Sequence, residues 1–343
     1  MKDKNSKKNA GTILILSLWS LGLLTVFSTQ MGLNVRQKIT LLSRLEARDK
    51  LYFLTESGIK KAIALLRADA ENKEEQWTPQ SKAFLHNNEA DLCNIALSQG
   101  VTEVSYGDLI GGKVESLKKC GMMDEESKIN LNKADPATLK RLIREISGLS
   151  EEGATDVADA IFDWREFGQS QLVGFASDEY YENLEFPYPP KNADYEIIDE
   201  LLLVKGVDEE LLKALGDYLT VYGEGKININ TASYPVLSAL GLDRELVDKI
   251  LKVRRGPDGL EASLDDHIFV NTYDITSEIQ NSVELEESEI KLLDDFNNQG
   301  RWVTQSAYYS IKSEGLLSKT SEKKTIVCVY KVDENKIVYW KED

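Results

Sequence analysis

The chain has 343 residues, of which 42% are hydrophobic and 29% are charged, so it exceeds one average domain and can bury a sizeable core. Its 58 acidic residues outnumber 41 basic ones, and the net charge of -17 repels nucleic-acid phosphates. Two His and three scattered Cys exclude a CxxC pair, an HExxH motif and any dense His/Cys metal cluster.

The N-terminus combines a basic leader with a long apolar span. The first ten residues contain four Lys and one Asp, and no further charge occurs before Arg36. The span from Thr12 to Leu33 is mostly apolar and long enough to cross about 30 Å of hydrocarbon as a helix. Because the Lys-rich side stays cytoplasmic, we expect a single-pass inner-membrane protein whose C-terminal bulk is periplasmic.

This segment has three possible interpretations: a cleaved secretory signal, a plain signal anchor or a prepilin-type signal. A secretory signal normally ends in an A-x-A site, and no good A-x-A site follows the apolar run. Gly11 instead lies between the basic leader and the apolar run, where a prepilin-type signal is cut. On this feature alone the plain anchor and the prepilin-type signal both remain open.

A helical pattern continues beyond the apolar span. Apolar residues keep a three-to-four spacing as far as Arg67, without Pro. At 1.5 Å per residue, a helix from Thr12 to Arg67 would be roughly 80 Å long. Its second half has one apolar stripe, which needs a sheet or another helix against it.

Strand patterns occur on both sides of a helical middle region. Residues 101–108 and 113–119 predict an antiparallel hairpin, and residues 301–341 predict a C-terminal antiparallel meander. Residues 123–299 between them are predicted to be helical. We therefore expect an α+β fold in which the long N-terminal helix packs on strands from both ends of the chain.

The middle region contains an internal repeat. KINLNKA (128–134) and KININTA (226–232) are each followed by a helix, a Gly-Leu pair and a second helix that ends near Arg. A third helix pair is predicted within residues 199–223. The repeat predicts helix-hairpin-helix units, with Asn132 and Asn230 suited to helix caps and to the tight turn that enters each helix.

Helix-hairpin-helix units also occur in proteins that grip DNA phosphates through hairpin amides. The turns here are SGLSEEG, VKGVDEE and LGLDREL, which place carboxylates where phosphates would lie. This opposes DNA binding and favours units used for packing and partner contact. The alternative function is a membrane-anchored protein that binds extracytoplasmic DNA.

Acidic residues gather on one face of the predicted helix 157–165 and in the DEYYENLE segment after it. Oxygen ligands on a helix and a loop can hold Ca²⁺. The candidate ligands are Asp159, Asp163, Glu166, Asp178 and Glu179. The other interpretation is a solvated acidic face, because no DxDxDG-type loop is present.

No catalytic motif is present: GxSxG, a P-loop and GxGxxG in a Rossmann context are all missing, so we expect no enzyme. In an oxidising compartment two of the three Cys could pair, and Cys93 with Cys120 is the pair we expect because they flank the first predicted hairpin. His86 and His267 lie in polar stretches and are expected at the surface.

Taken together, these segments resemble the type II secretion system minor pseudopilin K family, also called general secretion pathway protein K. The resemblance rests on the leader ending in Gly11, the long helix, DEESKINLNKAD, VADAIFDWRE, DELLLVKGV, YLTVYGEGKININTA and YKVDENKIVYWKE. It implies a pilin-like fold with a large inserted helical domain of helix-hairpin-helix, SAM-like type. It also implies a non-enzymatic subunit that caps and initiates the periplasmic pseudopilus.

The resemblance further implies partners and processing. The partners are the other minor pseudopilins, of I, J and H type, the major pseudopilin and the prepilin peptidase; no nucleic acid and no obligatory cofactor are implied. The peptidase would cut between Gly11 and Thr12, with methylation of Thr12. Pilin-like proteins usually carry Glu at the fifth mature position, where this chain has Leu16, as suits a subunit with no neighbour above it.

These inferences divide the chain into six parts. They are the leader (1–11), the transmembrane half of the helix (12–35), the periplasmic half with the first strands (36–122), the inserted helical domain (123–221), the second helical unit with its loops (222–299) and the C-terminal strands (300–343).

Overall fold

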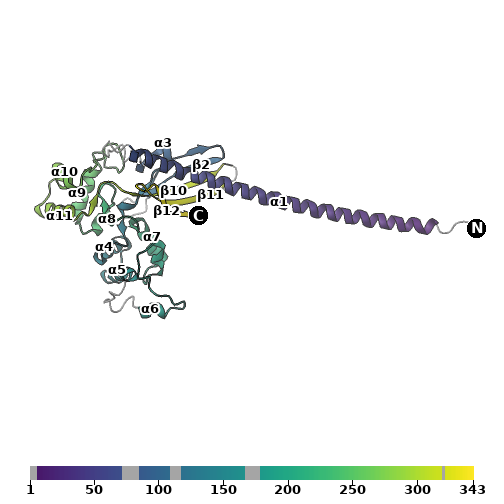
Figure 1. The fold of residues 1–343 in the computed structure, drawn as a ribbon, viewed down its shortest axis with the longest axis horizontal. Helices are drawn as coiled ribbons and strands as arrows, with labels where there is room; N and C mark the ends of the chain where they lie inside the picture. The colour runs from purple at the N-terminus through teal and green to yellow at the C-terminus, as the bar shows by residue number, and fades with distance from the viewer. Residues whose placement is uncertain (1–5, 72–84, 109–116, 167–177, 319–320) are drawn as a thin grey trace, which may run out of the picture.

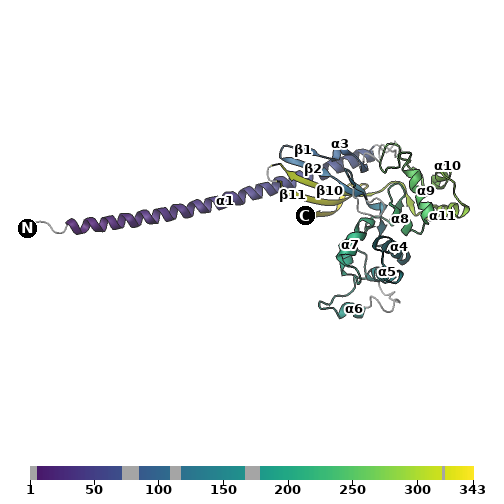
Figure 2. The same cartoon turned by 180° about the vertical axis from the view of Figure 1, so that it is seen from behind.

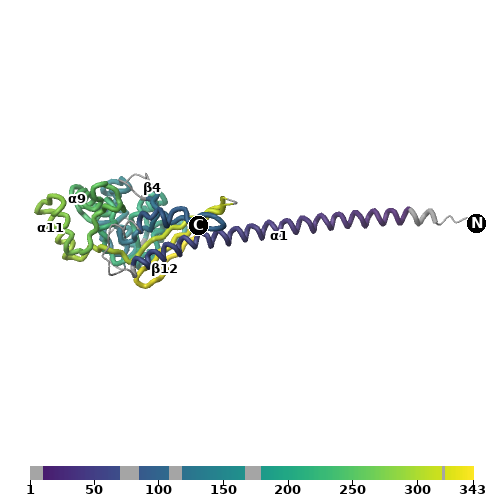
Figure 3. The backbone as a smooth tube through the Cα atoms, turned by 90° about the horizontal axis from the view of Figure 1, so that it is seen from above, coloured from purple at the N-terminus to yellow at the C-terminus, as the bar shows by residue number. Residues whose placement is uncertain are grey.

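The computed structural model describes residues 6–71, 85–108, 117–166, 178–318 and 321–343. Its longest element is the helix α1 (Ser6–Glu71), whose N-terminal half runs alone, away from a globular body (Figure 1). Figure 3, seen from above, shows the same separation. The expected helix from Thr12 to Arg67 lies inside α1, in which no Pro interrupts the backbone hydrogen bonds.

The C-terminal part of α1 packs on an antiparallel sheet of strand order β1-β2-β10-β11-β12, with β5 also paired to β10 (Figure 2). The strands are β1 (Ile95–Leu97), β2 (Gly100–Val104), β5 (Met123–Asp124), β10 (Tyr308–Leu317), β11 (Lys323–Lys331) and β12 (Lys336–Glu342). The meander expected near the C-terminus is therefore formed by β10 to β12. Strands from both ends of the chain form one sheet, as the sequence predicts.

The helix and the sheet approach each other closely. Gly315 of β10 has no side chain where a Cβ would overlap Thr55 of α1, and Gly58 of α1 faces Ser313 in the same way. The Ser313 hydroxyl donates to the Thr55 carbonyl at 2.8 Å. The buried core between the two layers is formed by Ile59, Ala62, Ile63 and Leu66 of α1 and by Ile311, Ile326, Cys328 and Tyr330 of the strands.

The hairpin predicted over 101–108 and 113–119 is partly wrong. Only β3 (Tyr106–Asp108) and β4 (Leu117–Lys119) pair with each other. Residues 100–104 instead form β2 and pair with β10. The reason is burial, since Thr102 and Val104 are fully buried in the layer beneath α1.

A helical module of residues 129–303 lies between β5 and β10 in the chain. Its longer helices are α4 (Pro136–Ser147), α5 (Glu151–Arg165), α7 (Glu209–Leu215), α8 (Tyr234–Ala239), α9 (Arg244–Arg254), α10 (Ile275–Ser282) and α11 (Glu287–Asn298). Short elements complete it: α6 (Asp178–Glu182), η2 (Ile198–Leu203), η3 (Gly216–Tyr218) and η4 (Thr272–Asp274). One hydrophobic core runs from Ile129 to Trp302, so the expected boundary at 221/222 lies inside a single core.

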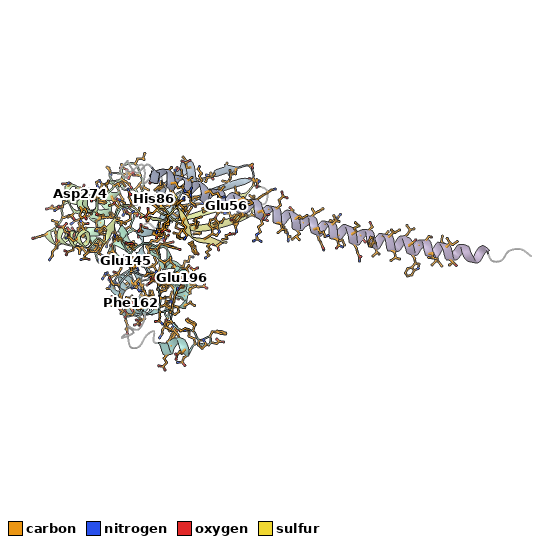
Figure 4. All side chains as sticks on the ribbon, in the orientation of Figure 1. Glu56, His86, Glu145, Phe162, Glu196 and Asp274 are labelled. Carbon is orange, nitrogen blue, oxygen red and sulfur yellow. A yellow bond between two sulfur atoms is a disulfide. The ribbon has the colours of Figure 1, made fainter. Side chains whose placement is uncertain are left out.

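Two short parallel strand pairs connect the module internally. β6 (Ile129–Asn130) pairs with β7 (Leu219–Thr220), and β8 (Ile227–Asn228) pairs with β9 (Trp302–Val303). Residues 302–303 were expected to start the meander, but they pair with the second repeat instead. In Figure 4, Glu145, Phe162 and Glu196 mark the lobe of α4 and α5, and Asp274 marks the end of the body farthest from the N-terminus.

Candidate functional site

The N-terminal half of α1 is an exposed apolar surface. Within the described residues, one helix, Gly11–Asp69, is long and apolar enough to cross a membrane, and its most apolar window has no buried residue. Leu16 is 66% exposed and Trp19 is 72% exposed. Such a surface is stable only in lipid or against other apolar helices. The structure thus fits a membrane anchor, as expected from the sequence.

The two processing residues lie inside this helix. α1 begins at Ser6 and continues through Gly11 and Thr12 without a break. A side chain at Gly11 would meet no atom within 4 Å, so the space beside this residue is open. Cleavage between Gly11 and Thr12 stays a prediction.

An apolar stripe continues the membrane surface onto the globular part of α1. Leu42, Leu45 and Phe53 follow a helical spacing on the side away from the sheet, and Phe53 is 64% exposed although it lies beside buried Leu54. We call these three residues the outer stripe. An exposed stripe of this type is suited to packing against a second helix.

The two repeats form equivalent turns. The side-chain oxygens of Asn130 and Asn228 each accept the backbone N–H two residues ahead, at 2.8 and 3.0 Å. Each turn is then closed by an Arg at the end of the second helix. Arg165 donates to the carbonyls of Leu131 and Ala134, and Arg254 donates to those of Ile229 and Ala232.

The expected capping role of Asn132 and Asn230 is wrong. Asp135 caps α4, and Ser233 precedes α8 without a side-chain cap. Asn132 instead exchanges two hydrogen bonds with the backbone of Tyr195, at 2.7 and 2.9 Å. Asn230 does the same with Phe269, at 2.9 and 2.8 Å. These side chains hold distant loops to the turns, and their partners lie too far along the chain for a local pattern to reveal them.

The turns between the paired helices of the module are acidic in three dimensions as well. The helices α5, α7 and α9 begin with capping side chains of Ser150, Asp208 and Asp243, each of which accepts a backbone N–H three residues later. Glutamates occupy the first turn of each helix. One amide at each helix start is thus already bonded to its cap and lies among negative charges, which disfavours the DNA-binding alternative.

The candidate calcium ligands are only partly brought together. Asp159 and Asp163 lie on α5; burial and the neighbouring Asp156 raise the pKa of the Asp159 carboxyl. The side chain of Asp178 lies outside the described residues. No group of three His, Cys, Asp or Glu side chains in metal-binding geometry is found in the described part of the chain. Calcium binding therefore stays a prediction.

The structure joins Cys93 and Cys120 in a disulfide with a Cα–Cα distance of 5.4 Å. The bond ties the segment after α3 (Glu89–Leu92) to the segment after β4. Cys328 is a buried thiol in β11, and burial raises its pKa to about 12. It is therefore a core residue and is not reactive at neutral pH.

The surface position expected for His86 is wrong. Its side chain is only 5% exposed, and its Nδ1 lies 2.8 Å from the Met122 carbonyl oxygen. Tyr106 donates its hydroxyl to the His86 carbonyl. His267 is 38% exposed and lies 2.7 Å from Glu278. The polar residues around His86 in the sequence gave no sign of a burial that depends on β3 and β5.

Sequence reasoning also missed an acidic junction between the sheet and the module. Asp124, Glu125 and Glu126 are consecutive and are all less than 10% exposed. The sequence carried no signal of this burial, because three charged residues in a row are normally exposed.

Comparisons with known proteins agree on one family. A family model described as type II secretion system (T2SS), protein K, matches residues 115–224. The type II secretion system protein K of Pseudomonas aeruginosa is 24% identical over 268 residues, which are 74% of this chain and 75% of that protein. The protein of the same name from Pectobacterium carotovorum subsp. carotovorum is 31% identical over 113 residues, 32% of this chain and 34% of that protein.

A solved structure shares the fold. One chain in the crystal structure of the GspK-GspI-GspJ complex from the type 2 secretion system of enterotoxigenic Escherichia coli matches with a TM-score of 0.60 at 16% identity. The match covers 88% of this chain and 98% of that chain. A match of this extent must include parts of both the sheet layer and the helical module.

Proposed function

Because the chain belongs to the type II secretion system protein K family, we propose that it is the minor pseudopilin that caps the pseudopilus tip and initiates its assembly. In this proposal α1 and its sheet are the pilin-like part, and the module is an insertion of helix-hairpin-helix units. The observation that carries the proposal is the combination of a fully exposed apolar helix with a bulky module at the other end of the molecule.

The membrane half of α1 supports a tip position. Leu16 stands where a carboxylate would pair with the N-terminal ammonium of a subunit above. An unpaired carboxylate in hydrocarbon costs several kcal/mol, so a subunit without an upper neighbour is more stable with Leu. Subunits below the tip can still pack on the exposed faces of this helix.

The module supports a capping role for a steric reason. In Figure 1 its part with α9 to α11 extends from the sheet on the side away from the membrane helix, and its part with α4 to α7 lies to one side of the sheet. Its single hydrophobic core makes it a rigid body, and a further subunit stacked on this end would collide with it. The molecule can therefore have neighbours below it and none above.

The orientation of the chain across the membrane is inferred from the charge of the leader and from the disulfide. The Lys-rich leader would remain in the cytoplasm until the prepilin peptidase removes it at Gly11, and the body would lie in the periplasm. The Cys93–Cys120 disulfide fits an oxidising compartment of this kind.

The partners in this proposal are the I-type and J-type minor pseudopilins, followed by the H-type and the major pseudopilin. The solved relative was crystallised as a GspK-GspI-GspJ complex, which supports the first two. We propose that they pack along the outer stripe of α1, where exposed Phe53 would be a central contact.

The test is co-purification of the full chain in detergent with the I-type and J-type pseudopilins of the same cell. Phe53→Glu should reduce the recovered partners roughly tenfold, because it places a charge in an apolar helix contact. Phe186→Glu is the matched control, because Phe186 is 79% exposed and lies in the module. Equal loss with both variants, or no complex with the unmodified chain, would contradict the proposal.

A further inference from the structure

The junction between sheet and module is formed by three consecutive carboxylates. Asp124 ends β5, which pairs with β10, and Glu125 and Glu126 begin the short helix η1 (Glu125–Ser127) that leads into the first repeat. Their exposed fractions are 2%, 3% and 9%. The chain passes from the sheet into the first half of the module through these residues.

Each carboxylate binds a different element. Asp124 Oδ2 accepts hydrogen bonds from Asn228 at 2.8 Å and from Thr231 at 2.5 Å, both in the second repeat. Glu125 accepts the Thr220 hydroxyl of β7 at 2.6 Å. Glu126 accepts the backbone N–H of Ala307, directly before β10, at 2.6 Å. The segment thus holds both repeats and the start of β10 together.

The junction has too little positive charge to neutralise all three carboxylates. Lys128 lies 2.7 Å from Glu125 and neutralises that carboxylate. Among the ion pairs of the described residues, none includes Asp124 or Glu126. Burying an ionised carboxylate without a cation costs several kcal/mol, so these two groups are more stable when they are neutral.

Glu126 faces acidic groups from each neighbouring element. They are Asp124 on its own segment, Asp333 in the turn between β11 and β12 and Glu224 in the loop before β8; the phenol of Tyr309 on β10 also faces it. Burial, together with these charges, raises the pKa of the Glu126 carboxyl to about 7 against the lowering effect of the Ala307 N–H. Burial also raises the pKa of Asp124, which has more donors around it.

The packing around Glu126 leaves little room for a local response. A Cβ placed on Gly223 would lie 2.9 Å from Glu126 Oε1, so the loop that carries Glu224 already touches the carboxylate. An ionised Glu126 is therefore repelled by the carboxylates of Asp124, Glu224 and Asp333, while the loop that carries Glu224 packs against it. Separation of these segments would let water screen that repulsion.

We propose that this junction is a proton-controlled hinge: a neutral Glu126 keeps the module closed against the start of β10, and an ionised Glu126 releases it. The direction of the pH effect follows from the linkage between proton binding by Glu126 and opening of the junction. The carboxyl titrates higher in the closed state than in a solvated open state, so closure is fully favoured below pH 4.5 and is weakened as the pH rises through about 7. The hinge is independent of the proposed function, because it rests on contacts within one chain.

The test is amide hydrogen exchange of the full chain in detergent micelles, followed at the peptide that contains Ala307. After correction for the intrinsic pH dependence of exchange, the opening equilibrium should rise roughly tenfold between pH 6 and pH 8.5. A peptide from the core face of α1, residues 59–66, should show no such change.

Three variants separate the hinge from a merely structural role. Glu126→Gln keeps the acceptor for Ala307 but cannot ionise, so its corrected exchange should not vary with pH. Asp333→Asn removes one facing charge, lowers the Glu126 pKa and should shrink the tenfold change. Glu314→Gln, at the Lys323 ion pair on the sheet surface, should behave like the unmodified chain. A pH-independent opening in the unmodified chain, or an unchanged pH dependence in Glu126→Gln, would overturn the proposal.

Discussion

Arg165 and Arg254 hold equivalent positions in the two halves of the module. Each ends the second helix of its repeat, is less than 10% exposed and donates to two carbonyls of the turn that starts the repeat. Arg254 also binds Glu261 at 2.6 Å. The internal repeat is thus a repeat of hydrogen bonds as well as of sequence, and each guanidinium closes one unit.

We expect Arg254→Met to destabilise the chain by about 3 kcal/mol, because it leaves the carbonyls of Ile229 and Ala232 without their donor and Glu261 without a buried partner. Arg244→Met is the control, since Arg244 is an exposed residue of the same helix and should change stability by less than about 0.5 kcal/mol. Urea unfolding followed by circular dichroism measures both. Equal stability of the two variants would contradict a closing role for Arg254.

A second prediction follows from the close approach of α1 to β10. Gly315→Ala should cost roughly 1 to 3 kcal/mol, because the added methyl group overlaps Thr55 and forces the helix away from the sheet. Gly216→Ala is the matched control, because a Cβ there meets no atom within 4 Å. Thermal unfolding of both variants provides the measurement, and a neutral Gly315→Ala would show that the two layers can shift at no cost.

Processing can be tested directly at the N-terminus. We expect the protein extracted from the membrane to begin at Thr12, with methylation of its amino group, and Gly11→Val to retain the leader because a branched side chain fills the open space at the cut. N-terminal sequencing and intact-mass measurement distinguish the two forms. A mature protein that still begins at Met1 would favour the plain signal anchor.

Calcium binding can be tested through its effect on the melting temperature, because a ligand that binds the folded chain stabilises it. If Asp159, Asp163 and their neighbours hold Ca²⁺, millimolar calcium should raise the melting temperature, and the double variant Asp159→Asn with Asp163→Asn should lose that rise. Glu209→Gln, at an acidic helix start elsewhere in the module, should keep it. No shift in the unmodified chain would favour a solvated acidic face.

Local patterns predicted the parts of this fold that depend on local physics. The long helix follows from apolar spacing without Pro, and β10 to β12 follow from alternation between turn residues. The duplicated K-I-N motif predicted two equivalent units, and they are present as equivalent turns.

The parts that local patterns could not predict depend on distant partners. The division of residues 100–108 between two sheets is decided by β10, about two hundred residues later. The burial of His86 and the roles of Asn132 and Asn230 likewise depend on loops far along the chain. The acidic junction has the composition of a surface segment, and only its three-dimensional surroundings make it buried.

The pairing of β2 with β10 has a consequence for the order of folding. Thr102 and Ser313 are hydrogen-bonded across a separation of 211 residues, so closing the sheet from an unfolded chain means closing a very long loop. If the module folds first, its own core brings Met123 and Ser310 side by side, and the remaining closure is short. We therefore expect the sheet to form last, and a chain that is stalled before β10 to leave the buried stripe of α1 uncovered and open to proteolysis.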